Sequence, residues 1–107
     1  MKIKQIYVIN LKRRKDKLKK MIKKINDIDE DGNIDVEIFE AFDGSKLDNN
    51  YLKDNNMAIL DDWRDPFKNT KINMGEIGCA LSHHKIWELI VKNNYNHCLI
   101  LEDDACF

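Results

Sequence analysis

Residues 3–11 read Ile-Lys-Gln-Ile-Tyr-Val-Ile-Asn-Leu, and this stretch decides the fold. Its short, nearly continuous run of β-branched and aromatic residues is typical of a buried strand. The next stretch, residues 12–25, repeats apolar residues at the spacing i, i+3, i+4 and i+7: Leu18, Met21, Ile22 and Ile25. That spacing predicts an amphipathic helix with a narrow apolar stripe and a lysine-coated outer face.

The rest of the chain continues the alternation of strands and helices. Residues 36–42 predict a second strand, closed by the turn dipeptide Asp43-Gly44. Residues 45–74 are polar and irregular, with one helical turn expected near Tyr51-Leu52. Residues 75–94 predict a long helix and residues 98–101 a third strand. This order predicts an α/β fold with a parallel sheet. We expect the apolar face of the long helix to consist of Ile77, Leu81 (or Ala80), Trp87 or His84, and Ile90-Val91.

Length and composition limit the classes of protein. A chain of 107 residues, with 43% hydrophobic and 35% charged residues, is typical of one globular domain at most. No apolar run reaches the ~18 residues of a membrane span, and no signal peptide is visible. We therefore expect no transmembrane segment, and the cytoplasm is the default compartment.

Residues 1–24 hold nine Lys and two Arg against Asp16 alone. No second basic patch or stacking aromatic series accompanies them, so we expect a solvated helix face and no nucleic-acid partner.

The three cysteines do not form a recognisable framework. Cys79, Cys98 and Cys106 are odd in number and widely spaced, which argues against paired disulfides. A zinc site can be tried from Cys79 and His83 with His97-Cys98, but no Cys-x-x-Cys occurs and the spacing differs from structural zinc sites. We therefore expect the cysteines to be buried small hydrophobes.

Three adjacent carboxylates, Glu102-Asp103-Asp104, follow the third predicted strand. Because the carboxyl ends of parallel strands share one edge, we expect them beside Asn10 and Asp43-Gly44. Alternation along a strand would point Glu102 and Asp104 to one side and Asp103 to the other. Such oxygen ligands suit Mg²⁺ or Mn²⁺ bridging a diphosphate, and a solvated acidic turn is the equal alternative.

A second acidic segment, Asp27 to Asp35, begins as an EF-hand calcium loop does, with Gly32 at the sixth position. The twelfth position holds Ile38 in place of the usual Glu, and a strand is expected to follow instead of a helix. A plain acidic turn is the favoured interpretation. A non-catalytic calcium-binding module is kept as an alternative from a different functional class.

The long helix begins with a strip of small residues: Gly75, Gly78, Cys79 and Ser82. Close approach by backbone or ligand would explain two glycines that each cost a helix ~1 kcal/mol, and a ragged helix start is the alternative. Ser82 and His83 are neighbours on the helix, so they do not face each other as nucleophile and base. A polar contact to a ligand is favoured over a hydrolase triad, and ordinary helix polarity is the simpler alternative.

Several blocks, taken together, resemble glycosyltransferase family 25. They are residues 8–16 (Val-Ile-Asn-Leu-Lys-Arg-Arg-Lys-Asp), 41–44 (Ala-Phe-Asp-Gly), and 75–87 (Gly-Glu-Ile-Gly-Cys-Ala-Leu-Ser-His-His-Lys-Ile-Trp) followed by 99–104 (Leu-Ile-Leu-Glu-Asp-Asp). Within the family, the chain is most similar to the procollagen galactosyltransferase branch. The resemblance implies a GT-A-like (Rossmann-like) nucleotide-sugar-binding sheet with flanking helices, incomplete in this chain. Residues 1–107 would be its N-terminal, donor-binding part.

The resemblance also implies an activity. Galactose would pass from UDP-galactose to an acceptor hydroxyl with inversion, in the presence of Mn²⁺ (or Mg²⁺). The acceptor would be hydroxylysine of a collagen-like protein, or alternatively lipooligosaccharide or another glycan. By residue matching, Glu102 and Asp104 would bind the metal, and Asp103 would lie near the ribose or sugar of the donor. The other donor-binding residues would be Asn10, Leu11, Arg13, Arg14, Asp43, Gly44, Ser82 and His83. The general base is expected beyond Phe107.

Overall fold

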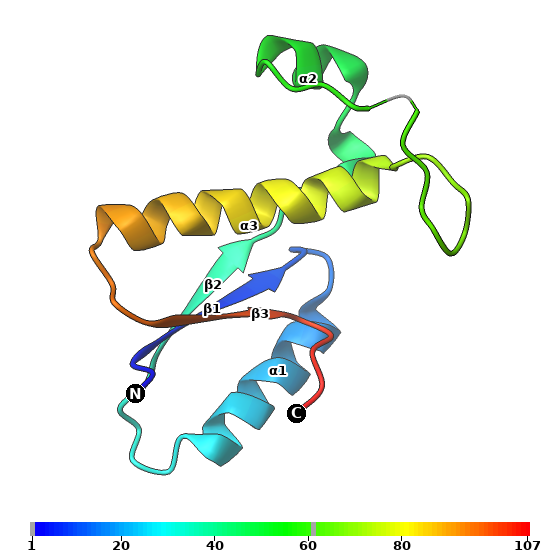
Figure 1. Ribbon diagram of the computed structural model, residues 1–107. Helices are drawn as coiled ribbons and strands as arrows, with labels where there is room; N and C mark the ends of the chain where they lie inside the picture. The colour runs from blue at the N-terminus through cyan, green and yellow to red at the C-terminus, as the bar shows by residue number, and fades with distance from the viewer. Residues whose placement is uncertain (1, 61) are drawn as a thin grey trace.

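The protein forms a three-stranded parallel sheet with a long helix on each face (Figure 1). The computed structural model describes residues 2–60 and 62–107. The elements in order are β1 (Gln5–Asn10), α1 (Lys15–Ile28), β2 (Asp35–Glu40), the 3-10 helix η1 (Gly44–Lys46), α2 (Asn49–Asp54), α3 (Met74–Lys92) and β3 (Cys98–Glu102). The strand order is β2-β1-β3, and both pairings are parallel. The predicted α/β class is confirmed, and the sheet has the form of a partial Rossmann-like fold.

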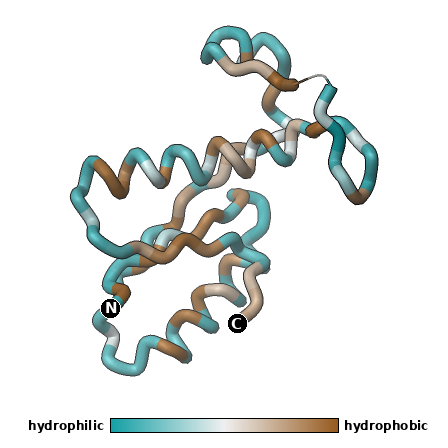
Figure 2. The backbone as a smooth tube through the Cα atoms, in the orientation of Figure 1, coloured by the Kyte–Doolittle hydropathy of each residue, from teal (hydrophilic) through white to brown (hydrophobic). Residues whose placement is uncertain are grey.

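Strand β1 is the centre of the core, and all six of its residues are buried. Its alternate side chains face opposite helices, as the pleat of a strand requires. The cluster on the α1 side contains Ile6, Val8, Met21 and Ile25, and the cluster on the α3 side contains Tyr7, Ile9 and Ile86. Figure 2 shows the hydrophobic strands in the middle, and hydrophilic and hydrophobic residues alternating along the helices on either side.

The stripe predicted for the first helix is confirmed at its centre. Met21 and Ile25 are each 1% exposed and Leu18 packs against them, whereas Ile22, also predicted in the stripe, is exposed. The helix begins at Lys15, later than the sequence pattern indicates. The reason is a turn after β1, in which the Arg14 N–H donates to the Leu11 carbonyl over 2.8 Å.

The apolar face predicted for α3 is partly wrong. Trp87 or His84, together with Val91, was expected on this face, yet Trp87 and Val91 are 55% and 79% exposed and His84 is exposed as well. The buried residues are Ile77, Gly78, Ser82 and Ile86, so the packed face runs at i, i+4 from Gly78. The small side chains let the helix approach the segment after β2, and Ile86 then meets the sheet.

No helix among residues 2–60 and 62–107 is long and apolar enough to span a membrane.

Close approach of backbones explains one of the two glycines of α3 and the glycine that begins η1. A Cβ on Gly78 would lie 2.6 Å from the Phe42 carbonyl oxygen, and one on Gly44 would lie 2.4 Å from the Met74 carbonyl oxygen. A Cβ on Gly75 would meet only Asn73 Oδ1, at 3.2 Å. The helix start is not ragged, because Asn73 and Glu76 form a reciprocal capping box.

The acidic segment between α1 and β2 is a hydrogen-bonded turn. Asp27 still belongs to α1, and Asp29 caps the helix end. The two carboxylate oxygens of Asp29 accept hydrogen bonds from the backbone N–H groups of Asn33 and Ile34, at 3.1 and 3.2 Å. A strand follows, as expected. These contacts favour the plain turn over the calcium loop.

Candidate functional site

A cavity of about 270 Å³ lies at the carboxyl edge of the sheet. Its walls come from the ends of β1 and β3, the segment after β2 and the beginning of α3. Eight residues predicted from the sequence line it: Leu11, Arg13, Asp43, Gly44, Ser82, Glu102, Asp103 and Asp104. The parallel sheet therefore brings the three polar clusters to one edge, as the sequence predicted from the shared edge of parallel strands. A larger, more open hollow lies between β2 and α3, but Glu102, Asp103 and Asp104 are not part of its wall.

Glu102 and Asp103 face opposite sides, as expected: Glu102 contacts Cys79 of α3, and Asp103 contacts Asn10. The pleat of β3 does not extend far enough to fix the last two carboxylates. Strand β3 ends at Glu102, so Asp103 and Asp104 lie in the turn that follows. Asp103 is fixed instead by Asn10, whose side-chain amide donates to Asp103 Oδ2 over 2.9 Å. The same amide donates to the Arg14 carbonyl over 3.0 Å. Asn10 is 4% exposed, so a buried residue of β1 holds the turn after β3 in place.

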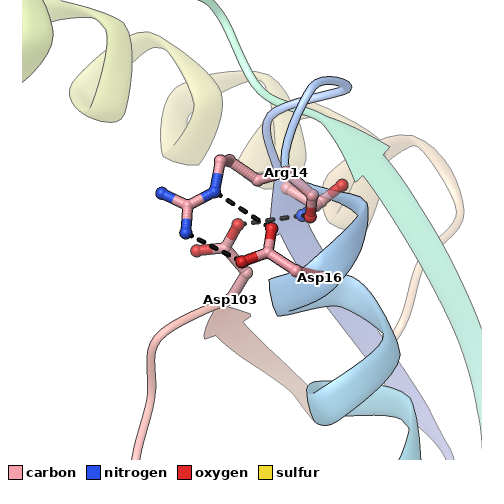
Figure 3. Close-up of polar contacts among 4 residues, drawn as sticks. Arg14, Asp16 and Asp103 are labelled. Carbon is pink, nitrogen blue, oxygen red and sulfur yellow. Dashed lines mark hydrogen bonds and ion pairs between the residues drawn. The ribbon is translucent and has the colours of Figure 1, made fainter.

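Arg14 lies beside Asp103 but does not line the cavity (Figure 3). Its guanidinium donates to both carboxylate oxygens of Asp16, at 3.1 and 3.0 Å. This hydrogen bonding is the main reason that the pKa of Asp16 falls to about 2, and it raises the pKa of Arg14. Arg14 thus has a structural partner at the start of α1. Its contact with a donor stays a prediction.

Arg13 and Asp43 form an ion pair at the wall of the cavity. Asp43 also caps the start of η1, because its Oδ1 accepts from the backbone N–H and the hydroxyl of Ser45, at 3.0 and 2.7 Å. Hydrogen bonds from Ser45, and then the Arg13 guanidinium, hold the pKa of Asp43 below its usual value. Asp43 is therefore a charged acceptor at neutral pH, and Arg13 contributes a fixed positive charge.

Ser82 lines the cavity but its hydroxyl already has two partners. The side chain is fully buried. Its Oγ donates to the Gly78 carbonyl over 2.8 Å and accepts from the Phe42 backbone N–H over 2.9 Å. Ser82 therefore positions the segment between β2 and η1 against α3. A direct contact between Ser82 and a donor stays a prediction.

Cys79 and His83 both face Glu102 from α3. The Cys79 thiol donates to Glu102 Oε1 over 2.8 Å, and His83 Nε2 lies 3.7 Å from the same oxygen. The hydrogen bond to Glu102 is the main reason that the pKa of Cys79 rises to about 11.

The expected burial of the cysteines is wrong at two of three positions. Cys79 and Cys106 are exposed and Cys98 is half-buried. Cys79 is exposed because it follows Gly78 on the side of α3 that faces the cavity, not the sheet. Nothing in the sequence pattern alone distinguishes these two sides.

The family profile described as glycosyltransferase family 25 (LPS biosynthesis protein) matches residues 3–107. The chain belongs to glycosyltransferase family 25. It is 44% identical over 107 residues to a glycosyltransferase 25 family member of Aedes aegypti, which covers 100% of this chain and 17% of that protein. It is 38% identical over 103 residues to procollagen galactosyltransferase 2 of Homo sapiens, covering 96% of the chain and 16% of the relative.

A third relative has a different name. The chain is 30% identical over 103 residues to inactive glycosyltransferase 25 family member 3 of Homo sapiens, which covers 96% of the chain and 17% of that protein. The chain thus spans about a sixth of the length of these curated relatives. No solved structure matches the chain significantly.

Proposed function

We propose that this chain is the donor-binding part of a glycosyltransferase of GT-A type. The whole protein would transfer galactose from UDP-galactose to an acceptor hydroxyl, with inversion. One observation carries the proposal: four carboxylates and one guanidinium meet in a single cavity at the carboxyl edge of a parallel sheet. Open α/β sheets bind their ligands at this edge.

The charge of the cavity supports a metal-dependent donor site. Asp43, Glu102, Asp103 and Asp104 are opposed in the cavity wall by Arg13. A diphosphate would be repelled by this surplus of negative charge unless a divalent cation accompanied it. Carboxylate oxygens fit Mn²⁺ or Mg²⁺, so the donor set suits such an ion.

Glu102 and Asp104 are the proposed ligands, because Asp103 is tied to Asn10. The ion would neutralise the charge that develops on the departing UDP. Arg13 would attract the diphosphate, and Asp103, held by Asn10, would accept a hydrogen bond from a hydroxyl of the donor. The base that activates the acceptor would come from outside these 107 residues.

The proposed acceptor is a hydroxylysine side chain of a collagen-like protein. Two relatives named procollagen galactosyltransferase 2, of Homo sapiens and Mus musculus, are each 38% identical to the chain over 103 residues. The family description names LPS biosynthesis, which supports a glycan acceptor as the second candidate. Relatives named inactive make a non-catalytic scaffold the third.

Calorimetric titration of UDP tests the donor site. We expect heat of binding with Mn²⁺ and none with Ca²⁺ or without metal. Asp104→Asn should abolish the Mn²⁺-dependent heat, whereas Asp31→Asn, in the exposed turn before β2, should retain it. Binding of UDP without metal, or retained affinity in Asp104→Asn, would contradict the proposal. Heat on titration of Ca²⁺ alone, lost in Asp31→Asn, would favour the calcium-binding module instead.

The acceptor is tested with the full-length protein. Transfer of galactose from UDP-galactose to a hydroxylysine-containing peptide is the expected result. Transfer to a glycan alone would favour the second candidate. Donor binding without transfer to either acceptor would favour the scaffold.

A further inference from the structure

Three side chains with three different ligand atoms converge beside the carboxylate cluster. Cys79 and His83 are four residues apart on α3, so both project from one face of the helix. Glu102 meets them from the end of β3. The sulfur, a ring nitrogen and a carboxylate oxygen all lie within 4.8 Å of one another.

The spacing of these atoms is close to that of a tetrahedral zinc site. Zinc bond lengths of about 2.0–2.3 Å place neighbouring ligand atoms about 3.3–3.6 Å apart in a tetrahedron. The observed separations are 2.8 Å from Cys79 Sγ to Glu102 Oε1 and 3.7 Å from His83 Nε2 to the same oxygen. The two values bracket the required range. The third separation, from sulfur to the imidazole nitrogen, is at most 4.8 Å, so the three side chains would have to close in on the ion.

We propose that Cys79, His83 and Glu102 bind a zinc-type divalent ion through one sulfur, one nitrogen and one oxygen. The fourth position would open into the cavity that Cys79 and Glu102 line, where water or a ligand could occupy it. The thiol proton, which now lies between sulfur and carboxylate, would pass to solvent as the metal replaces it. A thiolate and a carboxylate together balance the two positive charges of the ion.

The chemistry of these ligands separates the proposed site from the one assigned to Mn²⁺. Thiolate and imidazole favour zinc, whereas Mn²⁺ and Mg²⁺ favour oxygen ligands. The two sites share only Glu102. The proposal does not depend on donor binding or transfer, because the metal alone is the ligand.

Cobalt titration gives a direct test, since Co²⁺ is a coloured substitute for zinc in tetrahedral sites. At one equivalent of Co²⁺ we expect a thiolate-to-cobalt charge-transfer band and the visible bands of tetrahedral cobalt, both removed by Zn²⁺. Cys79→Ser should eliminate the charge-transfer band. His83→Gln should weaken binding by at least about tenfold, since outer-sphere changes alone cost that much.

Two variants serve as matched controls. Cys106→Ser removes another exposed thiol, and His84→Gln removes the next imidazole on α3, which lies 3.5 Å from Glu88. Both should keep the cobalt spectrum. Circular dichroism confirms that each variant is folded, and Cys79→Ala provides a second way to remove the sulfur. Absence of a charge-transfer band in the unaltered protein, its survival in Cys79→Ser and Cys79→Ala, or its loss in Cys106→Ser would overturn the proposal.

Discussion

Replacing Gly78 by alanine should destabilise the protein, although alanine is the better helix former. The new Cβ would lie 2.6 Å from the Phe42 carbonyl oxygen and 3.1 Å from the Gly44 nitrogen. Both contacts are with backbone, so relief requires the segment after β2 to move away from α3. The same movement stretches the hydrogen bond from the Phe42 N–H to Ser82.

The expected magnitude follows from three contributions. Overpacking costs about 1–3 kcal/mol, and weakening one buried hydrogen bond costs about 1 kcal/mol. The gain in helix propensity offsets about 1 kcal/mol. The net loss is therefore about 1–3 kcal/mol. With an unfolding entropy of about 2.1 cal/mol/K per residue, a domain of this size loses about 4–13 °C in Tm.

Gly75→Ala is the matched control on the same helix. Its Cβ would meet only the Asn73 side chain, at 3.2 Å, so we expect a free energy of unfolding within about 1 kcal/mol of the unaltered protein. Thermal and urea unfolding measure both variants. A Gly78→Ala protein as stable as Gly75→Ala would refute the close packing of α3 against the segment after β2.

Three further predictions concern single contacts. Glu102→Gln should lower the pKa of Cys79 from about 11 and raise the rate of Cys79 alkylation at pH ~8 by about tenfold. Peptide mass spectrometry measures this rate, and an unchanged rate would argue against the hydrogen bond between the thiol and the carboxylate. Arg14→Gln should return the pKa of Asp16 from about 2 toward ~3.9 in an NMR titration. Because the folded state depresses this pKa, the ion pair stabilises the protein above pH ~4 and this stabilisation is lost as the pH falls toward 2. In Arg14→Gln the free energy of unfolding should therefore depend less on pH between about 4 and 2. Ser82→Ala should lower the free energy of unfolding, measured by thermal unfolding, by about 1–2 kcal/mol, because the backbone N–H of Phe42 loses its hydrogen-bond acceptor.

The parallel sheet and its polar edge could be predicted because they depend on local patterns. The apolar run through Tyr7 is too continuous for a half-exposed strand, and it is the buried central strand. Polar residues directly after each strand must then meet at one edge, whatever the details of packing. Asn10, Asp43 and Glu102 were located by this argument alone.

The face of α3 could not be predicted, because it depends on what the helix packs against. Periodicity indicated Trp87 or His84, whereas Ile86 is the buried residue. The sequence does not show that Gly78 lies against the carbonyl of Phe42. The exposure of Cys79 was missed for the same reason. The bond from Asn10 to Asp103 joins residues 93 positions apart, so no local pattern could indicate it.

Glu102 is the side chain at which the two proposed metal chemistries compete. It lies in the wall of the cavity with Asp104, yet its Oε1 already contacts the Cys79 thiol and lies near His83. Removing the Glu102 carboxylate should therefore weaken both metal sites and cannot separate them. Asp104→Asn should affect only the oxygen-ligand site, and Cys79→Ser only the cobalt charge-transfer band. Loss of both properties in either of these two variants would mean that the cavity binds a single ion, held jointly by sulfur and oxygen.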